Sequence, residues 1–284
     1  MSAPEPFGAR LRRATAARGP LCVGIDPHAS LLAAWDLPDD PAGLERFART
    51  VVEALADRVA VLKPQSAFFE RHGARGLAVL ERAVAEAREA GALVLLDVKR
   101  GDIGSTMAAY AEAYLAPGAP LRADAVTLSP YLGFESLRPA FDLARRHGAG
   151  VFVLARTSNP EGAEVQTATA PGGGTLGARM LTALARENAG ARPLGSFGAV
   201  VGATLRPEDA AGLPLAINGP LLAPGIGAQG ATAADLPGLF GEALPDVLPS
   251  VSREILRHGP SPAGLRAAAA RQAEGLAAVL GATG

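Results

Sequence analysis

The chain has 284 residues, of which 49% are hydrophobic and 19% are charged, and its formal net charge is −1. This length and apolar content suit one large α/β domain or two small ones around a buried core. Without a basic block the chain does not resemble a nucleic-acid-binding protein, and Pro, Gly and charged residues interrupt every apolar run before it reaches membrane-spanning length.

Apolar, strand-like runs alternate with helix-like segments along the chain. The pattern predicts a short amphipathic helix at 6–18 and then strands at 21–26, 59–63, 93–99, 124–129, 150–157, 198–204, 219–227 and 246–253. Helix-period segments lie between them at 41–57, 73–91, 107–115, 134–148 and 175–190, and most end in glycine, as helices commonly do. An Ala-rich helix at 261–281 follows the last strand.

Eight alternations of strand and helix predict a (β/α)8 TIM barrel of the α/β class. We expect residues 1–284 to form a single barrel domain with a short N-terminal helix in front of the first strand. A doubly wound open sheet is the alternative, because a count of strands does not prove that the sheet closes.

The segment 93–106, LVLLDVKRGDIGST, is the most informative part of the chain. Asp97 and Lys99 are two positions apart, so on a strand their side chains point to the same face. Gly101 is expected to turn the backbone and bring Asp102 close to the pair, and Ser105 or Thr106 to cap the next helix. Such a charge network predicts perturbed pKa values and catalysis, whereas the alternative is a salt bridge that only joins two loops.

Lysine usage supports the catalytic interpretation. Only two of the 27 Lys and Arg residues are lysines, and these are Lys63 and Lys99. Both follow apolar runs at the ends of predicted strands. An ammonium group can donate a proton at these positions, whereas a guanidinium group scarcely does.

In TIM barrels the active site lies at the C-terminal ends of the strands. The polar residues of this chain gather at those ends, namely Asp26, Lys63, Asp97, Lys99, Ser129, Ser158 and Arg253. Asp26 also has a second interpretation, as the cap of a following helix.

The last two strands are followed by residues that suit a phosphate. The loop APGIGAQGA at 223–231 contains Gly225, Gly227 and Gly230, whose backbone N–H groups can approach an anion. Arg253 follows the eighth strand, at the start of a short helix. TIM barrels often hold a phosphate group between these two loops, so we expect a phosphate site here.

Two further expectations concern the compartment and metals. The N-terminal residues MSAPEPFGARLRR contain no apolar segment of a secretory signal, and the lone Cys22 allows no internal disulfide, so we expect a cytoplasmic protein. The four histidines show no metal-ligand spacing, so we expect neither zinc nor another metal cofactor.

Together these motifs resemble those of the orotidine 5′-phosphate decarboxylase family. The resemblance is carried by DVKRGDIGST at 97–106, GIDP around Asp26, LKP around Lys63, the PGIGAQG loop and the late Arg253. The segments SPYLG and RTSNPEG and the chain length are similar to the longer bacterial subfamily, type 2. The resemblance implies loss of CO2 from orotidine 5′-phosphate to give UMP, the last step of de novo pyrimidine nucleotide synthesis, without cofactor or metal.

The resemblance also implies a role for each matching residue. Lys63 and Asp97 would orient and tune Lys99, which would protonate C6 of the pyrimidine. Asp102 and Thr106 would reach into the neighbouring subunit's site, which makes the protein a homodimer with shared sites. For the substrate, the resemblance implies that Asp26 binds ribose hydroxyls, Ser158 contacts the pyrimidine (with Gln166 or Ser129 as alternatives), Gln229 links base and phosphate, and Arg253 with the backbone of Gly225 and Gly227 holds the phosphate.

Two other functions remain as alternatives. Metal-dependent sugar-phosphate aldolases and decarboxylases of the same superfamily share the Asp-x-Lys-x-x-Asp motif, but they resemble one another in having a glutamate where this chain has Lys63. A non-catalytic sensor of a phosphate ligand is the third possibility. The complete set of charges disfavours it, since a sensor needs no buried proton donor.

Overall fold

The computed structural model describes residues 4–281, so the ends of the expected 1–284 domain, residues 1–3 and 282–284, lie outside the described residues. Eight parallel strands form a closed barrel in sequence order, and the last strand pairs with the first. This closure confirms the TIM barrel and makes the open-sheet alternative wrong. The strands are β1 (Cys22–Ile25), β2 (Val61–Pro64), β3 (Leu93–Arg100), β4 (Ala125–Leu128), β5 (Gly150–Arg156), β6 (Phe197–Val201), β7 (Leu221–Pro224) and β8 (Val247–Val251).

The strands are apolar along their length because both of their faces are buried. One face of each strand points into the barrel, where Leu95, Phe152 and Leu248 pack with other buried side chains in an interior cluster. The other face packs against the surrounding helices in a much larger cluster. The barrel interior is therefore filled with side chains, and a site can form only at one of its ends.

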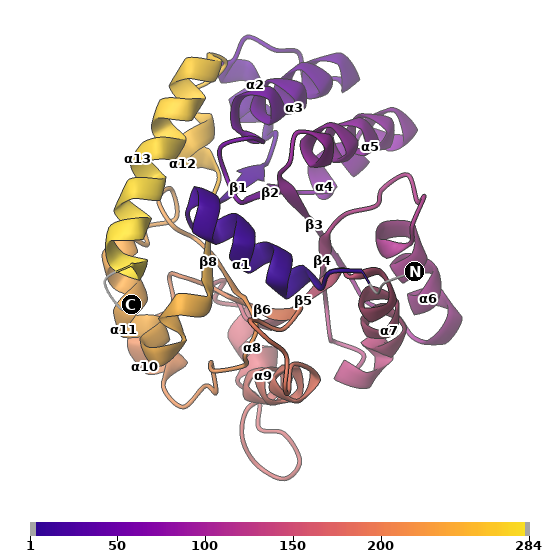
Figure 1. Ribbon diagram of the computed structural model, residues 1–284, viewed down its shortest axis with the longest axis vertical. Helices are drawn as coiled ribbons and strands as arrows, with labels where there is room; N and C mark the ends of the chain where they lie inside the picture. Colours follow the sequence, from indigo (N-terminus) through magenta and orange to yellow (C-terminus); the bar gives the residue numbers. More distant parts are fainter. Residues whose placement is uncertain (1–3, 282–284) are drawn as a thin grey trace.

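The N-terminal helix α1 (Phe7–Arg18) lies across the N-terminal end of the barrel, in front of the strands in Figure 1. Phe7 and Leu11 belong to the interior cluster, and the Phe7 ring packs edge-on against Phe152 with centroids 6.0 Å apart. The predicted helix at 6–18 therefore exists and closes the end of the barrel opposite to the expected active site.

The remaining helices surround the strands (Figure 1). The long predicted ones are present as α3 (Pro41–Leu55), α5 (Gly73–Glu89), α6 (Gly104–Leu115), α7 (Arg138–His147), α9 (Leu176–Glu187) and α13 (Pro262–Leu280). Shorter helical segments complete the connections, namely α2 (Ala29–Ala34), α4 (Ala67–Glu70), η1 (Phe134–Leu137), α8 (Gly162–Gln166), α10 (Pro207–Ala210), η2 (Ala233–Asp235), α11 (Leu236–Phe240), η3 (Gly241–Asp246) and α12 (Arg253–Leu256). Within residues 4–281, none of the helices combines the length and apolar character of a membrane span.

The expected cap of α6 is wrong. The helix begins at Gly104, the N-cap residue is Ile103, and no side chain caps it. Ser105 and Thr106 lie inside the first turn and are exposed. The nearest polar side chain before the helix is Asp102, whose Oδ1 accepts a hydrogen bond from the N–H of Ile103 at 2.8 Å and so does not reach further into the helix.

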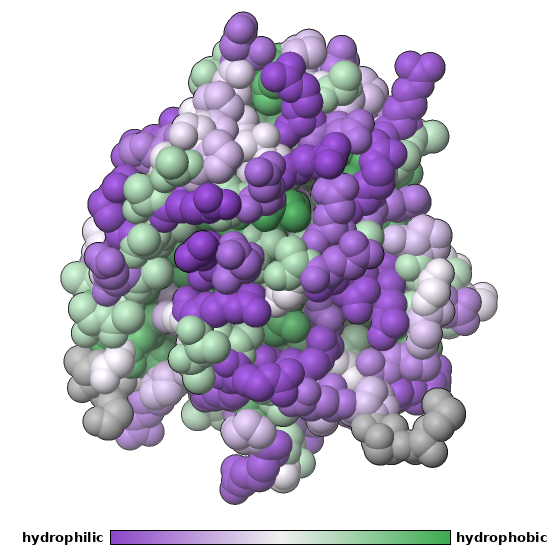
Figure 2. Space-filling view, turned by 45° about the horizontal axis from the view of Figure 1, so that its top comes forward, coloured by the Kyte–Doolittle hydropathy of each residue, from purple (hydrophilic) through white to green (hydrophobic). Residues whose placement is uncertain are grey.

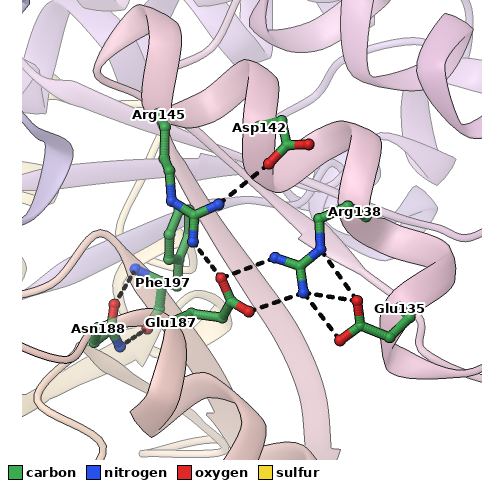
Figure 3. Close-up of polar contacts among 7 residues, drawn as sticks. All are labelled: Glu135, Arg138, Asp142, Arg145, Glu187, Asn188 and Phe197. Atoms are coloured by element: carbon green, nitrogen blue, oxygen red, sulfur yellow. Dashed lines mark hydrogen bonds and ion pairs between the residues drawn. The ribbon is translucent and has the colours of Figure 1, made fainter.

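A polar network joins α7 and α9 on the outside of the barrel (Figure 3). Glu187 accepts hydrogen bonds from both Arg138 and Arg145, and the Arg145 guanidinium lies over the Phe197 ring. The next residue, Asn188, is buried, and its side chain donates to the carbonyl of Phe197 at 2.7 Å and accepts from its N–H at 3.1 Å. The network anchors α9 to the start of β6.

Candidate active site

A cavity with a volume of about 390 Å³ lies at the C-terminal ends of the strands. Eight of the twelve residues predicted for the site line it: Asp26, Lys63, Asp97, Lys99, Ser158, Gly225, Gln229 and Arg253. Four do not: Asp102, Thr106, Ser129 and Gly227. The eight lining residues come together because all strands of a parallel barrel end at the same rim.

The centre of the cavity is a row of alternating charges. Asp97 lies between two lysines, with Oδ2 3.1 Å from Lys63 Nζ and Oδ1 2.7 Å from Lys99 Nζ. Lys63 and Asp97 are buried, whereas the Lys99 side chain is 44% exposed. Thr127 donates a hydrogen bond from Oγ1 to Asp97 Oδ1 at 2.7 Å, and Lys99 Nζ lies 3.4 Å from Gln65 Oε1. The buried Lys63–Asp97 pair therefore holds the ammonium group of Lys99 at the cavity surface.

Burial and mutual attraction act in opposite directions on these groups. Burial alone would raise the pKa of Asp97, but the ammonium groups of Lys63 and Lys99 outweigh it and lower that pKa below its ordinary range. Burial alone would likewise lower the pKa of Lys63, but the carboxylates of Asp97 and Asp26 outweigh it and raise that pKa. Both groups are consequently charged at neutral pH.

The backbone at Lys99 departs from strand geometry. Its φ is +46°, in the left-handed region that side-chain-bearing residues rarely occupy, and the pairing of β3 with β4 shifts register between Leu96 and Arg100. The Lys99 N–H donates to Thr127 Oγ1 at 3.0 Å, which fixes the turn. Gly101, expected to be the turning residue, has another role: a Cβ there would lie 2.3 Å from the carbonyl oxygen of Ser129.

The opposite side of the cavity contains groups that lack partners. Asp26 Oδ1 and Ser252 Oγ are buried and have no hydrogen-bond partner among the described residues. Gly225 has φ +114°, which suits glycine, and Arg253 is exposed at the start of α12 without a carboxylate paired to it within residues 4–281. A ligand with hydroxyl donors and an anionic group would satisfy this side.

The loop after β5 approaches the cavity through Thr157, Ser158 and Asn159. Gln166 does not line the cavity. Its side chain instead accepts from the N–H of Thr157 and donates to Thr157 Oγ1, both at 2.8 Å, so it supports the loop from behind. Of the three candidates for the pyrimidine contact, only Ser158 faces the cavity.

Asp102 does not join the charge network of its own chain, so the expectation that the turn brings it close to Asp97 and Lys99 is wrong. Its carboxylate is bonded to the Ile103 N–H, and Thr106 is exposed nearby on α6. Ser129 contributes its backbone to the packing against Gly101, and Gly227 packs against Glu254, where a Cβ would lie 2.8 Å from the Glu254 Cβ. These four positions lie at the margin of the site.

Several lining residues were not found from the sequence. Thr127 lies within the apolar strand β4, where the sequence gives no signal for it. Gln65 follows Lys63 and Pro64, and this position at the end of β2 is the only signal that the sequence offers. His28 also lines the cavity, packs against the Phe68 ring at 4.3 Å, and has a pKa lowered by burial and by Arg253 against the opposing effect of Asp26.

The cavity lining includes the ammonium groups of Lys63 and Lys99 and the guanidinium group of Arg253, which can bind anionic groups of a ligand. Within residues 4–281, no three His, Cys, Asp or Glu residues lie close enough together to hold a metal ion.

Comparison with known proteins shows the family to which the chain belongs. Residues 19–268 match the model of the family described as orotidine 5′-phosphate decarboxylase / HUMPS. Orotidine 5′-phosphate decarboxylases of Streptomyces coelicolor and Salinispora arenicola are 72% and 66% identical over 267 residues each, which is 94% of this chain and 95% of each relative.

Solved structures extend the similarity to the fold. A crystal structure from Streptomyces avermitilis is 67% identical, covers 99% of this chain and 98% of its own, and superposes with a TM-score of 0.95. The structure of Leishmania donovani OMP decarboxylase is 30% identical, covers 97% of this chain and 99% of its own, and has a TM-score of 0.76. The chain therefore belongs to the orotidine 5′-phosphate decarboxylase / HUMPS family.

Proposed function

We propose that this protein converts orotidine 5′-phosphate into UMP and CO2, the last step of de novo pyrimidine nucleotide synthesis, without a metal or cofactor. The observation that carries the proposal is the Lys63–Asp97–Lys99 charge row at the rim of the barrel, which faces a cavity with an anion-binding side. The family description names orotidine 5′-phosphate decarboxylase together with HUMPS. The curated relatives reported above carry the decarboxylase name.

In the proposed reaction, the bond between C6 of the pyrimidine and its carboxylate breaks, and the electron pair stays on C6. No π-system accepts this pair, so the stabilisation must come from fixed charge placed next to the carbon. The Lys99 ammonium supplies that charge and then transfers a proton to C6. The resulting amine of Lys99 recovers its proton from water, so no group is consumed.

Asp97 has two roles in this proposal. Its hydrogen bond of 2.7 Å to Lys99 aims the ammonium group, and Lys63 keeps the carboxylate ionised by lowering its pKa. An ionised Asp97 next to the substrate carboxylate also destabilises the bound substrate relative to the transition state, in which that carboxylate leaves as neutral CO2. Lys63 and Thr127 act as positioning residues, because they hold Asp97 and not the substrate.

The other polar groups of the cavity, some of which lack partners, bind the remaining parts of the substrate in this proposal. A ribose hydroxyl can donate to the buried Asp26 Oδ1, which has no partner in the described chain. Arg253 and the backbone around Gly225 bind the phosphate, Gln229 lies between them and the base, and Ser158 contacts the pyrimidine. Phosphate binding far from C6 provides binding energy that the enzyme uses to align the ring over Lys99.

We also propose a homodimer in which each site receives Asp102 and Thr106 from the partner subunit. Three large apolar side chains are exposed in this region. Ile103, next to Asp102 in the chain, is 61% exposed, and Tyr131 and Leu132, on the loop after β4, are 77% and 54% exposed. Exposed apolar groups of this size favour a contact with a second copy. A partner that covers them would place Asp102 beside the Lys99 end of the opposite cavity.

A cytoplasmic location completes the proposal. The single cysteine, Cys22, is a buried free thiol whose pKa is raised by burial to about 12, and such a residue suits a reducing compartment.

The experiment that tests the function is a continuous assay of the purified protein with orotidine 5′-phosphate in the presence of EDTA. We expect the substrate absorbance to fall with stoichiometric formation of UMP, identified by mass spectrometry. Loss of all activity in EDTA and its return with Mg²⁺ would contradict the metal-independent mechanism and support a metal-dependent relative. Absence of turnover together with tight UMP binding would instead support a sensor.

A further inference from the structure

A second cavity lies at the opposite end of the barrel from Lys99. It has a volume of about 170 Å³ and is lined by residues next to the starts of strands, including Asp124 before β4 and Ala149 before β5. Helix α1, which crosses this end of the barrel in Figure 1, contributes Arg10. Figure 2, which is turned by 45° from this view, shows hydrophilic residues interspersed with apolar ones over the surface. Nothing in the proposed reaction uses this cavity.

Basic side chains, three arginines and one histidine, come from four separate parts of the chain and meet in the cavity. Arg10 comes from α1, Arg88 from α5, Arg122 from the segment before β4, and His147 from the end of α7. Arginine groups are planar, multiple hydrogen-bond donors that match the geometry of phosphate and carboxylate oxygens. Convergence of three guanidinium groups from distant segments is therefore suited to an oxyanion.

One buried carboxylate holds two of these arginines in place. Asp124 Oδ1 lies 2.6 Å from Arg10 Nη1, and Asp124 Oδ2 lies 3.3 Å from Arg88 Nε and accepts the N–H of Val94 at 2.9 Å. Arg10 Nη2 also donates to the carbonyl of Gly148 at 2.8 Å, which satisfies an oxygen at the C-terminal end of α7. Asp124 is thus fully engaged, and it fixes the guanidinium groups before any ligand arrives.

Arg122 is the group that remains without a partner. No hydrogen bond or ion pair involves its side chain within residues 4–281, although it is half-buried in the cavity wall. Its pKa is lowered by burial and by the positive charges of Arg88 and Arg10, against the opposing effect of Asp124. The positive groups therefore repel one another, and an anion between them would relieve that repulsion.

The charges of the wall leave a positive surplus. Glu5, the other carboxylate of the cavity, is paired with Arg13. Arg10 and Arg88 share the single negative charge of Asp124, and Arg122 adds one more positive charge. With His147 neutral, the three arginines and two carboxylates of the wall leave one positive charge, and Arg13, which lies outside the wall and neutralises Glu5, raises the surplus to two, the charge that a dianion would balance.

We propose that this cavity binds a small dianionic oxyanion of the hydrogen phosphate type, with Arg122 as its main ligand and Arg10, Arg88 and His147 as further donors. The site is separate from the catalytic cavity and does not depend on the proposed function. A bound anion ties together α1, α5, α7 and the start of β4, and so stabilises the folded barrel by mass action.

The test uses His147 as a local reporter, because the chain has only four histidines and their imidazole NMR signals can be assigned with a His147→Asn variant. The full-length protein is titrated with inorganic phosphate at constant ionic strength, with chloride as the balancing anion. We expect a saturable change in the His147 signal and a rise of its titration midpoint, since a nearby anion favours the imidazolium form.

Two variants distinguish this site from phosphate bound elsewhere. Arg122→Gln removes the unpartnered guanidinium without breaking the Asp124 pairs, and it should abolish the His147 response while the thermal unfolding curve without phosphate stays cooperative. Arg146→Gln, on the exposed side of α7, is the matched control and should keep the response. A His147 signal that does not respond to phosphate, responds equally to chloride, or responds equally in Arg122→Gln would overturn the proposal.

Discussion

Lys99 Nζ lies 2.7 Å from Asp97 Oδ1 even though the Lys99 backbone, with φ +46°, departs from extended geometry near the end of β3, the strand that also holds Asp97. The left-handed conformation of a residue with a side chain costs about 1 kcal/mol or more. The hydrogen bond from the Lys99 N–H to Thr127 and the ion pair to Asp97 offset this cost. Thr127 and Asp97, which the proposed reaction needs, therefore also stabilise the unfavourable backbone conformation of Lys99.

Replacement of Lys99 tests the proton donor. Lys99→Ala should lower turnover by at least about 10²-fold to 10⁴-fold, the usual effect of losing a general acid, while UMP binding stays measurable by calorimetry. Lys99→Arg should not restore turnover, because a guanidinium group scarcely gives up a proton. An arginine variant with near-wild-type turnover would remove Lys99 from this role.

The stability of the charge row should depend on pH in a defined direction. Asp97→Asn leaves Lys63 buried without its counter-ion, so the free energy of unfolding should fall by about 3 kcal/mol at neutral pH. The pKa of Asp97 is lowered in the folded state, so the stability from its ionised form is complete above the ordinary value of 3.8 and is lost as the pH falls through the lower folded value.

The measurement is urea unfolding of wild type and Asp97→Asn at a series of pH values. The difference between the two should stay constant down to about pH 4 and then shrink. Asp142→Asn, which changes an exposed carboxylate on α7, is the control and should show little difference at any pH. A difference that grows, instead of shrinking, as the pH falls below about 4 would contradict the assigned direction.

Gly101 should be required for its size. In Gly101→Ala the added Cβ would lie 2.3 Å from the Ser129 carbonyl oxygen, so the end of β3 must move and displace Lys99. We expect a loss of about 1–3 kcal/mol in unfolding free energy and a drop in kcat. Gly275→Ala, in α13 with open space at its Cβ, is the matched control and should be neutral or stabilising by about 0.5–1 kcal/mol. Equal behaviour of the two variants in both measurements would show that the contact with Ser129 is unimportant.

A mixing experiment tests the shared site. If each site takes Lys99 from one subunit and Asp102 from the other, inactive Lys99→Ala and inactive Asp102→Ala should complement each other. Random mixing of equal amounts gives roughly half heterodimers, each with one intact site, so activity should reach about a quarter of the wild-type level. Subunit exchange verified by mass spectrometry without any return of activity would show that Asp102 acts within its own chain.

The barrel itself could be predicted from the sequence because each of its strands is an apolar run between turn residues. All eight predicted strands exist, although ranges such as 219–227 and 246–253 extend beyond β7 and β8. The short helices α2, α4, α8 and α10 were not predicted. Helices of four to six residues have little periodicity of their own and form only when tertiary contacts support them.

Site residues could be predicted where their type is unusual in the sequence. They were missed where their place in the site depends on the pairing of strands. Two lysines in the whole chain, both after apolar runs, indicated Lys63 and Lys99 directly. Thr127 was missed because a threonine in a strand is ordinary, and only the pairing of β4 with the irregular end of β3 places it against Asp97. The left-handed conformation of Lys99 was missed for the same reason, since it is fixed by a contact from another strand.

The most direct test of the central claim is the reaction of orotidine 5′-phosphate with the wild-type protein in D2O, followed by NMR spectroscopy of the product. We expect one CO2 released per substrate and UMP that carries deuterium at C6 and at no other ring carbon, because an exchanged Lys99 ammonium delivers the deuteron to the carbon that lost CO2. A product without deuterium at C6, or with deuterium at another carbon, would contradict it.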